Sequence, residues 1–491
     1  MSEALAGLPP PPPPAEPRPA AAVILWREGP AGREVYWVRR GEALSFAGGF
    51  YAFPGGRLDH ADSTVPVPGL EGEAAAFAAC ACRELFEETG VLLARGAERL
   101  ARAEREEGRR AVLADHQGFG AFLAAKGLTL DAGRLEPAGR WVTPDFSPLR
   151  YDTRFFTARL PEGEEANVWP GELSGGEFVA PSRALAMWER GDLTLHPPVW
   201  LGMRCLERAA PPEALPMLRT PQASVRIQFQ KGIWLEALRT PTLPPAAHTN
   251  CWILDLGDGV AVVDPGSPWP EEQVRLDRFL DGLAAEGRPA REVWLTHHHG
   301  DHVGGVARLA GRGLAILAHP FTAGRLGLAA RPLREGDLLH GRWRVLHTPG
   351  HAPGHLVFHD EQSRALIAGD MVSTLSTVII DPPEGDMAEY LRQLERLRTL
   401  RPRTLYPAHG VPAPNGPAKI EEYLAHRRAR EERVLGALRR GGALAEVTRL
   451  AYDDTPAVML PAAERSCLAS LEKLRSEGRA RLDGERWSLA G

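Results

Sequence analysis

A run of histidines with one aspartate, in the second half of the chain, could bind metal ions. His297, His299, Asp301 and His302 fall within six residues, directly after the apolar run 293–296, which is typical of a buried strand. Imidazole and carboxylate groups are ligands that a borderline cation such as Zn²⁺ accepts. A strand that opens into a tight loop here could turn all four side chains toward one site. The alternative is a fortuitous or exposed histidine tract, which predicts no further ligands elsewhere.

Further candidate ligands share the same local context. Asp264, His351, Asp370 and His409 each follow an apolar run, on a turn that contains glycine or proline. Ligands that come from several strand ends toward one edge make a metal cleft, which argues against chance. His355, four residues after His351, either lines the pocket or holds a carboxylate ligand from behind.

Together these residues resemble the ordered motifs of the metallo-β-lactamase superfamily. The resemblance implies an αββα sandwich with two zinc or other divalent transition-metal ions at one edge. It divides the ligands into sets: His297, His299 and His351 on one ion; Asp301, His302 and His409 on the other; Asp370 between the ions and Asp264 behind the ligands; His298 and Gly300 as spacers. Two ions ~3.5–4 Å apart would hold a bridging hydroxide that attacks a carbonyl carbon or a phosphorus atom. Asp301 is the predicted catalytic residue of this domain.

A second acidic cluster lies on a helix predicted for residues 71–89. Glu84, Glu87 and Glu88 stand at i, i+3 and i+4, so their carboxylates share one face. Unpaired carboxylates there would repel one another, and a hard divalent cation such as Mg²⁺ would relieve the repulsion through oxygen ligation. By charge alone, a solvated acidic face is an equally good interpretation.

The surrounding segment, Arg83-Glu84-Leu85-Phe86-Glu87-Glu88-Thr89-Gly90-Val91, resembles the second half of the Nudix box. The resemblance implies an α/β/α Nudix domain that cleaves a pyrophosphate linkage. Its Mg or Mn would be bound by Glu84, Glu87 and Glu88, with Glu87 and Glu88 as the catalytic pair and Arg83 orienting one ligand.

The first half of the box departs from the family. Gly56, which matches its first glycine, lies 27 residues before Arg83, nearly twice the family spacing. Ala75 stands where the family has glutamate, and Glu73 is the nearest substitute. Segments such as 141–144, 150–156 and 195–198 resemble the branch that acts on coenzyme A and related diphosphates. The domain is therefore an active diphosphatase or a degenerate domain that senses a ligand or serves only as structure.

The C-terminal part predicts helices at 418–438, 444–452 and 460–477, then a hairpin at 479–489 with an Asp-Gly turn. This order suggests a small winged helix. Nucleic-acid binding is its usual association, but the local charge is mixed, so a packing role is at least as well supported. Metal domain, helix and winged helix together resemble the β-lactamase-like protein 2 branch, whose animal members are single-strand-specific endoribonucleases.

Length and composition set the outer limits. The 491 residues predict several domains: a disordered Pro-rich tail at 1–20, a Nudix-like domain at 21–207, a linker at 208–223, a metallo-β-lactamase domain at 224–415, and a helix plus winged helix at 416–491. The net charge of −5 gives no global attraction to nucleic acid or anionic membrane. Five scattered cysteines make no disulfide framework, which favours a reducing cytoplasm. No apolar run could span a membrane, and no secretory signal is visible.

The sequence therefore predicts a cytoplasmic, metal-dependent hydrolase. Its expected substrate is single-stranded RNA, a nucleoside diphosphate or a coenzyme A derivative, and no membrane partner is expected. The alternative is a thioesterase, similar to hydroxyacylglutathione hydrolase, whose Nudix domain senses a nucleotide without catalysis. The oligomeric state stays open.

Overall fold

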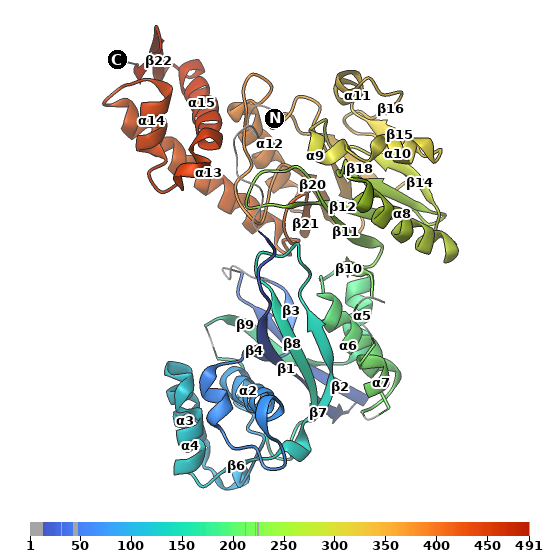
Figure 1. Cartoon of the computed structure of the whole chain (residues 1–491), viewed down its shortest axis with the longest axis vertical. Helices are drawn as coiled ribbons and strands as arrows, with labels where there is room; N and C mark the ends of the chain where they lie inside the picture. The colour runs from blue at the N-terminus through green and yellow to red at the C-terminus, as the bar shows by residue number, and fades with distance from the viewer. Residues whose placement is uncertain are drawn as a thin grey trace. The chain divides into compact units, whose positions relative to one another are not determined.

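The computed structural model describes residues 13–30, 32–42, 48–169, 171–211, 213–220, 222 and 225–490. The chain forms two compact units, one from Pro14 to Lys231 and one from Gly232 to Gly491 (Figure 1). Most of the predicted Pro-rich tail, 1–20, lies outside the described residues, and the first strand already begins at Arg18. Within the described part of the chain, every helix is too short or too polar to cross a membrane.

The N-terminal unit is built on a mixed sheet whose main path runs β3-β2-β1-β8-β7. β1 and β2 form an antiparallel hairpin, and β8 lies parallel to β1. β4 pairs with β1, and β9 pairs with β2. The bounds are β1 Arg18–Gly29, β2 Gly32–Arg40, β3 Tyr51–Ala52, β4 Gly55–Arg57, β7 Glu136–Val142, β8 Tyr151–Arg159 and β9 Leu173–Val179, with a separate small pair β5 Ala94–Arg95 and β6 Thr129–Leu130.

Helices cover both faces of this sheet, which makes the predicted α/β/α sandwich (Figure 1). Side chains alternate along β1: Val23 and Leu25 pack in the cluster that contains α2, and Ile24 packs in the cluster of α5 and α6. The helix bounds are α2 Gly72–Thr89, α3 Arg102–Ala114, α4 Phe119–Ala125, α5 Pro181–Glu189, α6 Pro197–Arg208 and α7 Leu215–Leu218. α2 ends, as predicted, at Gly90, which adopts a left-handed φ of 77°.

The segment predicted as a linker, 208–223, contains structure. Short helix α7 buries Leu215 and Leu218 in the same hydrophobic cluster as α5 and α6. Its Pro- and Ala-rich composition suggested a solvated connection, but the two leucines, three residues apart, supply an apolar face that belongs to the N-terminal core. Strand β10, Ile227–Gln230, is the last element before the second unit begins.

A half-buried histidine makes the stability of the N-terminal unit dependent on pH. His196 precedes α6, its ring centroid lies 4.2 Å from that of Phe50, and burial lowers its pKa from 6.5 to about 4, assisted by the charge of Arg40. His196 therefore becomes protonated near pH 6.5 in the unfolded chain but only near pH 4 in the folded chain. The contribution of His196 to stability is full above pH 6.5 and falls across this window by about 3 kcal/mol.

Urea unfolding of the whole chain between pH 7 and pH 4 measures this loss. His196→Phe should flatten the pH dependence, and the same substitution at exposed His60 should leave it in place. An equal slope in wild type and His196→Phe would show that another group causes the dependence.

The second unit contains two stacked sheets. One has the order β11-β12-β13-β14-β15-β16 and the other the order β17-β18-β19-β20-β21. The bounds of the first are β11 Ile233–Arg239, β12 His248–Asp255, β13 Val260–Val263, β14 Ala290–Trp294, β15 Ala315–Ala318 and β16 Arg331–Pro332. Those of the second are β17 Leu338–Leu339, β18 Trp343–His347, β19 Leu356–Asp360, β20 Ala365–Gly369 and β21 Thr404–Pro407. Aromatic contacts join the inner faces, for example Trp294 with Phe358 and Trp252 with Tyr406.

Helices cover the outer face of each sheet, which confirms the αββα sandwich. α8 packs its leucines on the first sheet, and α12 and α13 pack on the second. The bounds are α8 Pro270–Ala285, α9 Gly300–Val303, α10 Val306–Gly311, α11 Pro320–Leu326, α12 Met387–Thr399 and α13 Gly416–Leu438.

The winged-helix module, residues 444–489, follows on α13. It consists of α14 Leu444–Ala451, α15 Leu460–Ser476 and the hairpin β22 Ala480–Asp483 with β23 Arg486–Leu489. Its core joins the end of α13 to α14, α15 and Trp487. Because α13 belongs to both cores, the module is continuous with the sandwich.

Candidate metal centre

Strand ends deliver the predicted ligands to one edge of the sandwich. Asp264 follows β13, and the His297–His302 segment follows β14, which is parallel to β13. Asp370 follows β20 and His409 follows β21, which are also parallel neighbours. Because parallel strands end at the same sheet edge, residues far apart in sequence converge there.

Three histidine rings meet at one point. His297 Nε2 lies 2.8 Å from His299 Nδ1, and His351 Nε2 lies 3.0 Å from His299 Nδ1 and 3.3 Å from His297 Nε2. In the tautomers that direct lone pairs inward, ring nitrogens this close repel one another unless a cation lies between them. The three atoms form a group that could hold one metal ion.

A second group lies beside the first. Asp301, His302 and His409 form a buried set that could hold another ion. Asp370 lies against both groups, with one carboxylate oxygen 3.4 Å from His351 Nε2 and the other 3.6 Å from His409 Nε2. Asp301 Oδ1, His302 Nε2 and Asp370 Oδ1 are buried and have no hydrogen-bond partner among the described residues. Buried polar atoms normally have partners, so this donor set fits a pair of divalent cations.

Hydrogen bonds hold the outer side of these rings. Asp264 accepts from the backbone N–H and the hydroxyl of Thr296, at 2.8 and 2.6 Å, and lies 2.8 Å from His302 Nδ1. The carbonyl of Ile379 lies 2.9 Å from His351 Nδ1, and the carbonyl of His248 lies 2.9 Å from His409 Nδ1. Each of these imidazoles therefore directs Nε2 inward, as ligands of a metal usually do.

The electrostatics of the site favour a bound cation. Burial lowers the pKa of His297 and His299 well below the usual value, so both rings are neutral, which is the form that binds metal. For His302, burial disfavours charge, but nearby Asp370 and Asp301 outweigh it and raise the pKa well above the usual value. The buried carboxylates thus attract positive charge to this point.

Two further histidines, His355 and His298, contact residues around the candidate ligands. His355 neither lines the pocket nor contacts a carboxylate: its Nε2 accepts the backbone N–H of Asp370 at 3.1 Å. Gly369 allows this approach, because a Cβ there would lie 2.6 Å from His355 Nε2. His298, predicted as a spacer, pairs with Glu384 at 2.8 Å.

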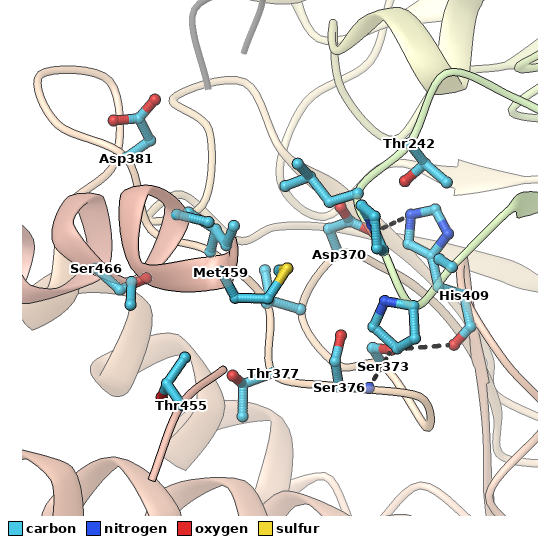
Figure 2. A pocket seen from close by; sticks show the side chains of 18 of the residues that line it. Thr242, Asp370, Ser373, Ser376, Thr377, Asp381, His409, Thr455, Met459 and Ser466 are labelled. Carbon is cyan, nitrogen blue, oxygen red and sulfur yellow. Dashed lines mark hydrogen bonds and ion pairs between the residues drawn. The ribbon is translucent and has the colours of Figure 1, made fainter. Parts of the chain in front are cut away.

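A pocket of about 570 Å³ opens from the metal cluster. Asp301, Asp370 and His409 line one end, and residues of α13, of the connection between α14 and α15, and of α15 line the other (Figure 2). Between them lies the site loop, defined as residues 373–386. Apolar atoms contribute most of the pocket surface. The apolar side chains of the wall are Leu243, Pro244, Pro245, Ala246, Val378, Ile379, Pro456, Val458, Met459, Ala462 and Ala463, and polar side chains, among them His426, Arg427, Arg430 and Tyr452, also line it.

The carboxylates of the Nudix helix are held by Arg83 and by the glycine turn. Arg83 donates to Glu84 at 2.9 Å and to Glu87 at 3.1 Å, so it orients two of the predicted ligands. Glu88 accepts the N–H of Gly55 at 3.0 Å. Burial raises the pKa of Glu84 to about 7 and that of Glu88 to about 8.

The carboxylates of this second site are ligands that suit Mg²⁺, although their oxygen atoms lie less close together than the ligand atoms of the histidine site. A Cβ on Gly56 would lie 2.5 Å from the carboxylate of Glu84, so only glycine fits there. Among the described residues, the groups of three ligands close enough to hold an ion include none from this helix. The acidic cluster nevertheless loses its solvent on folding, which makes a compensating cation favourable.

The structure also identifies a residue that the sequence comparison missed. Asp62 is 1% exposed and accepts from Arg83 Nε and Nη2, at 2.8 and 2.9 Å. Glu73, the expected substitute, is an exposed residue whose nearest cation is Arg154. Asp62 lies six residues after Gly56, so counting forward from the glycine would have found it; counting back from Arg83 crosses the inserted residues.

Removing this partner should destabilise the N-terminal unit. Burial alone would lower the pKa of Arg83, but hydrogen bonds and charge from Asp62 and Glu84 outweigh it and raise the pKa. Asp62→Ala leaves a buried guanidinium without its bidentate partner, which costs about 3 kcal/mol. Urea unfolding measures the loss, and Asp115→Ala, at an exposed aspartate of the same unit, is the control. An unchanged midpoint for Asp62→Ala would contradict this assignment.

Comparison with known proteins agrees with this architecture. Residues 244–409 match the model of the metallo-beta-lactamase superfamily, 67–206 match the NUDT19 Nudix domain, and 444–487 match the beta-lactamase associated winged helix domain. The lactamase-like protein nscB of Trichophyton rubrum is 30% identical over 254 residues, which cover 46% of this chain and 76% of that protein. The chain belongs to the metallo-beta-lactamase superfamily. This metallo-beta-lactamase family protein is a hydrolase that also carries a Nudix domain.

A further relative and a solved structure are also similar to about half of this chain. The beta-lactamase-like protein 2 homolog of Drosophila melanogaster is 28% identical over 261 residues, 49% of this chain and 87% of that protein. A solved metallo-beta-lactamase family protein from Thermus thermophilus is 25% identical, with a TM-score of 0.47, and the match covers 53% of this chain and 100% of that one. Both families use divalent metals, which agrees with the ligand clusters.

Proposed function

We propose that the second unit is a binuclear metallohydrolase. One ion, expected to be zinc, is bound by His297, His299 and His351, and the other by Asp301, His302 and His409. Asp370 would contribute to both sites, since its two oxygens lie near one histidine of each set. Bound there, the cations lower the pKa of water toward ~7 and supply the nucleophile. Asp264, behind His302, holds that ring in the tautomer that presents Nε2.

We further propose that the substrate is a thioester with an apolar acyl group. The pocket beside Asp370 is the observation that carries this choice, because its wall is largely apolar. Water adds to the thioester carbonyl, the C–S bond breaks, and the thiol leaves with a proton while the acid remains. A volume near 570 Å³ lies within the range of small-molecule sites, about 300–1,000 Å³.

Single-stranded RNA is the second candidate substrate. Two arginines of α13 line the pocket and favour a phosphate, but both have protein partners. Arg430 pairs with Asp454, and Arg427 donates to the carbonyl of Val378. An RNA groove needs several cations along the backbone and several aromatic platforms for bases. This pocket is lined by two arginines that already have protein partners and by a single tyrosine, Tyr452.

A substrate screen decides between the two. Zinc-loaded protein should hydrolyse acyl-coenzyme A esters, detected by thiol release, and should leave single-stranded RNA intact. Cleavage of RNA with no thiol release from any thioester would refute the thioester assignment.

For the N-terminal unit, we propose a Mg²⁺- or Mn²⁺-dependent diphosphatase that acts on a coenzyme A derivative or another nucleoside diphosphate. Glu84, Glu87 and Glu88 bind the ion, and Arg83 orients Glu84 and Glu87. The bidentate pair of Asp62 with Arg83 supports an intact site in spite of the lengthened box. The alternative, a domain that senses a nucleotide without cleaving it, predicts binding without turnover. A cytoplasmic location stays a prediction.

A further inference from the structure

Helix α15 of the winged-helix module turns one face toward the hydrolase pocket. Ala462, Ala463 and Ser466 of α15 and Met459, which directly precedes the helix, all line the pocket, and the four positions have the spacing i, i+3, i+4 and i+7. Three of these four side chains are small, so the helix leaves room at this end. Figure 2 shows Met459 and Ser466 on the helix side and Asp370 and His409 across the pocket.

Hydrogen bonds fix the wall between α15 and the metal cluster. Arg465 pairs with Asp381 and donates to the carbonyl of Pro382 at 2.6 Å. The N–H of Ile380 reaches the hydroxyl of Ser466 at 3.4 Å. The site loop, whose Ile379 carbonyl orients His351, is therefore tied to the same helix that closes the pocket. Helix and metal cluster form the two ends of one enclosure.

A polar atom in this enclosure also lacks a partner. Arg427 is 6% exposed and lines the pocket, and its Nε has no hydrogen-bond partner in the described part of the chain. Asp301 and Asp370 present unpartnered oxygens at the other end. Buried donors and acceptors of this kind require a ligand or water. The pocket is thus suited to a molecule that is polar at its reacting end, accepts a hydrogen bond beside Arg427, and is apolar where it meets Met459, Ala462 and Ala463.

We propose that α15 sets the acyl-chain specificity of the hydrolase, with Ala462 and Met459 limiting the depth of the pocket. The winged-helix module then serves as the specificity wall of the active site. This inference rests on the proposed thioester hydrolysis, in which the carbonyl lies at Asp370 and the acyl chain extends toward α15. Ala462 is 2% exposed, lines the pocket and lies outside the hydrophobic cluster of the module. Its methyl group therefore faces the space that the acyl chain of the substrate would occupy.

Two substitutions should move the specificity in opposite directions. Ala462→Leu adds three carbons to the pocket, and each displaced methylene of the substrate lowers kcat/KM roughly fourfold. We expect kcat/KM for the longest good substrates to fall by on the order of 10- to 50-fold, with acetyl-coenzyme A unaffected. Met459→Ala enlarges the pocket and should shift the optimum to longer chains. Ala457→Leu, an exposed neighbour outside the pocket, is the matched control.

The experiment measures kcat/KM on straight-chain acyl-coenzyme A esters from acetyl to palmitoyl, and binding of the corresponding free fatty acids by calorimetry. Opposite shifts in chain length for Ala462→Leu and Met459→Ala, absent from Ala457→Leu, support the proposal. Unchanged profiles in Met459→Ala, which needs no extra space to fold, would overturn it. If the wild type cleaves no thioester, the proposed function fails. The fatty-acid profiles then still decide the role of α15, and equal binding in all variants would refute it.

Discussion

Asp370→Asn should reduce hydrolysis in the second unit by on the order of a thousandfold or more. The asparagine keeps the size of the side chain but loses the negative charge and one of the two oxygens that face the histidine groups. Because a bridging carboxylate holds both ions, its loss should lower affinity for the second ion and with it the supply of activated water. Thiol release from an acyl-coenzyme A ester measures the effect.

The control is Asp258→Asn, the same substitution at an exposed turn. Circular dichroism and unfolding midpoints establish that both variants fold. Activity within about threefold of wild type in Asp370→Asn would mean that Asp370 does not bridge a catalytic pair of ions.

Glu87→Gln should abolish the diphosphatase activity of the first unit, by on the order of a thousandfold, while thioester hydrolysis persists. Glu87 lies on the acidic face of α2 and shares Arg83 with Glu84. An amide retains the hydrogen bond from Arg83 but cannot neutralise a divalent cation. Mg²⁺-dependent cleavage of coenzyme A, followed by chromatography, measures the loss.

Glu73→Gln provides the matched control, because Glu73 lies on the same helix but is exposed and pairs with Arg154 instead of Arg83. Comparison of the two variants shows whether diphosphatase activity depends on the carboxylate of Glu87 itself or only on the negative charge of the helix. If wild type binds coenzyme A without cleaving it, and Glu87→Gln behaves alike, the sensing alternative is correct.

Local patterns predicted that the candidate metal ligands converge, because these residues follow a simple rule. Each candidate stands directly after an apolar run, and the fold places those strand ends at one edge. The helix and hairpin of the winged-helix module were also predictable, from periodicity and from the turn at Gly484.

Contacts between distant segments were not predictable from such patterns. Asp62 was missed because inserted residues separate it from Arg83, and only folding returns it to that guanidinium. The partner of His298, Glu384, lies 86 positions away. Likewise, the sequence indicated a winged helix but not that α15 would line the pocket, since this depends on how α13 carries the module back toward the site loop.

A zinc titration measures whether the second unit binds two metal ions at Asp370. Metal-free Glu87→Gln protein, in which the Nudix site is weakened, is titrated with Zn²⁺ by isothermal calorimetry. We expect two tightly bound equivalents of Zn²⁺ per chain, and one or none when Asp370→Asn is added. A single equivalent, or a stoichiometry that Asp370→Asn leaves unchanged, would contradict it.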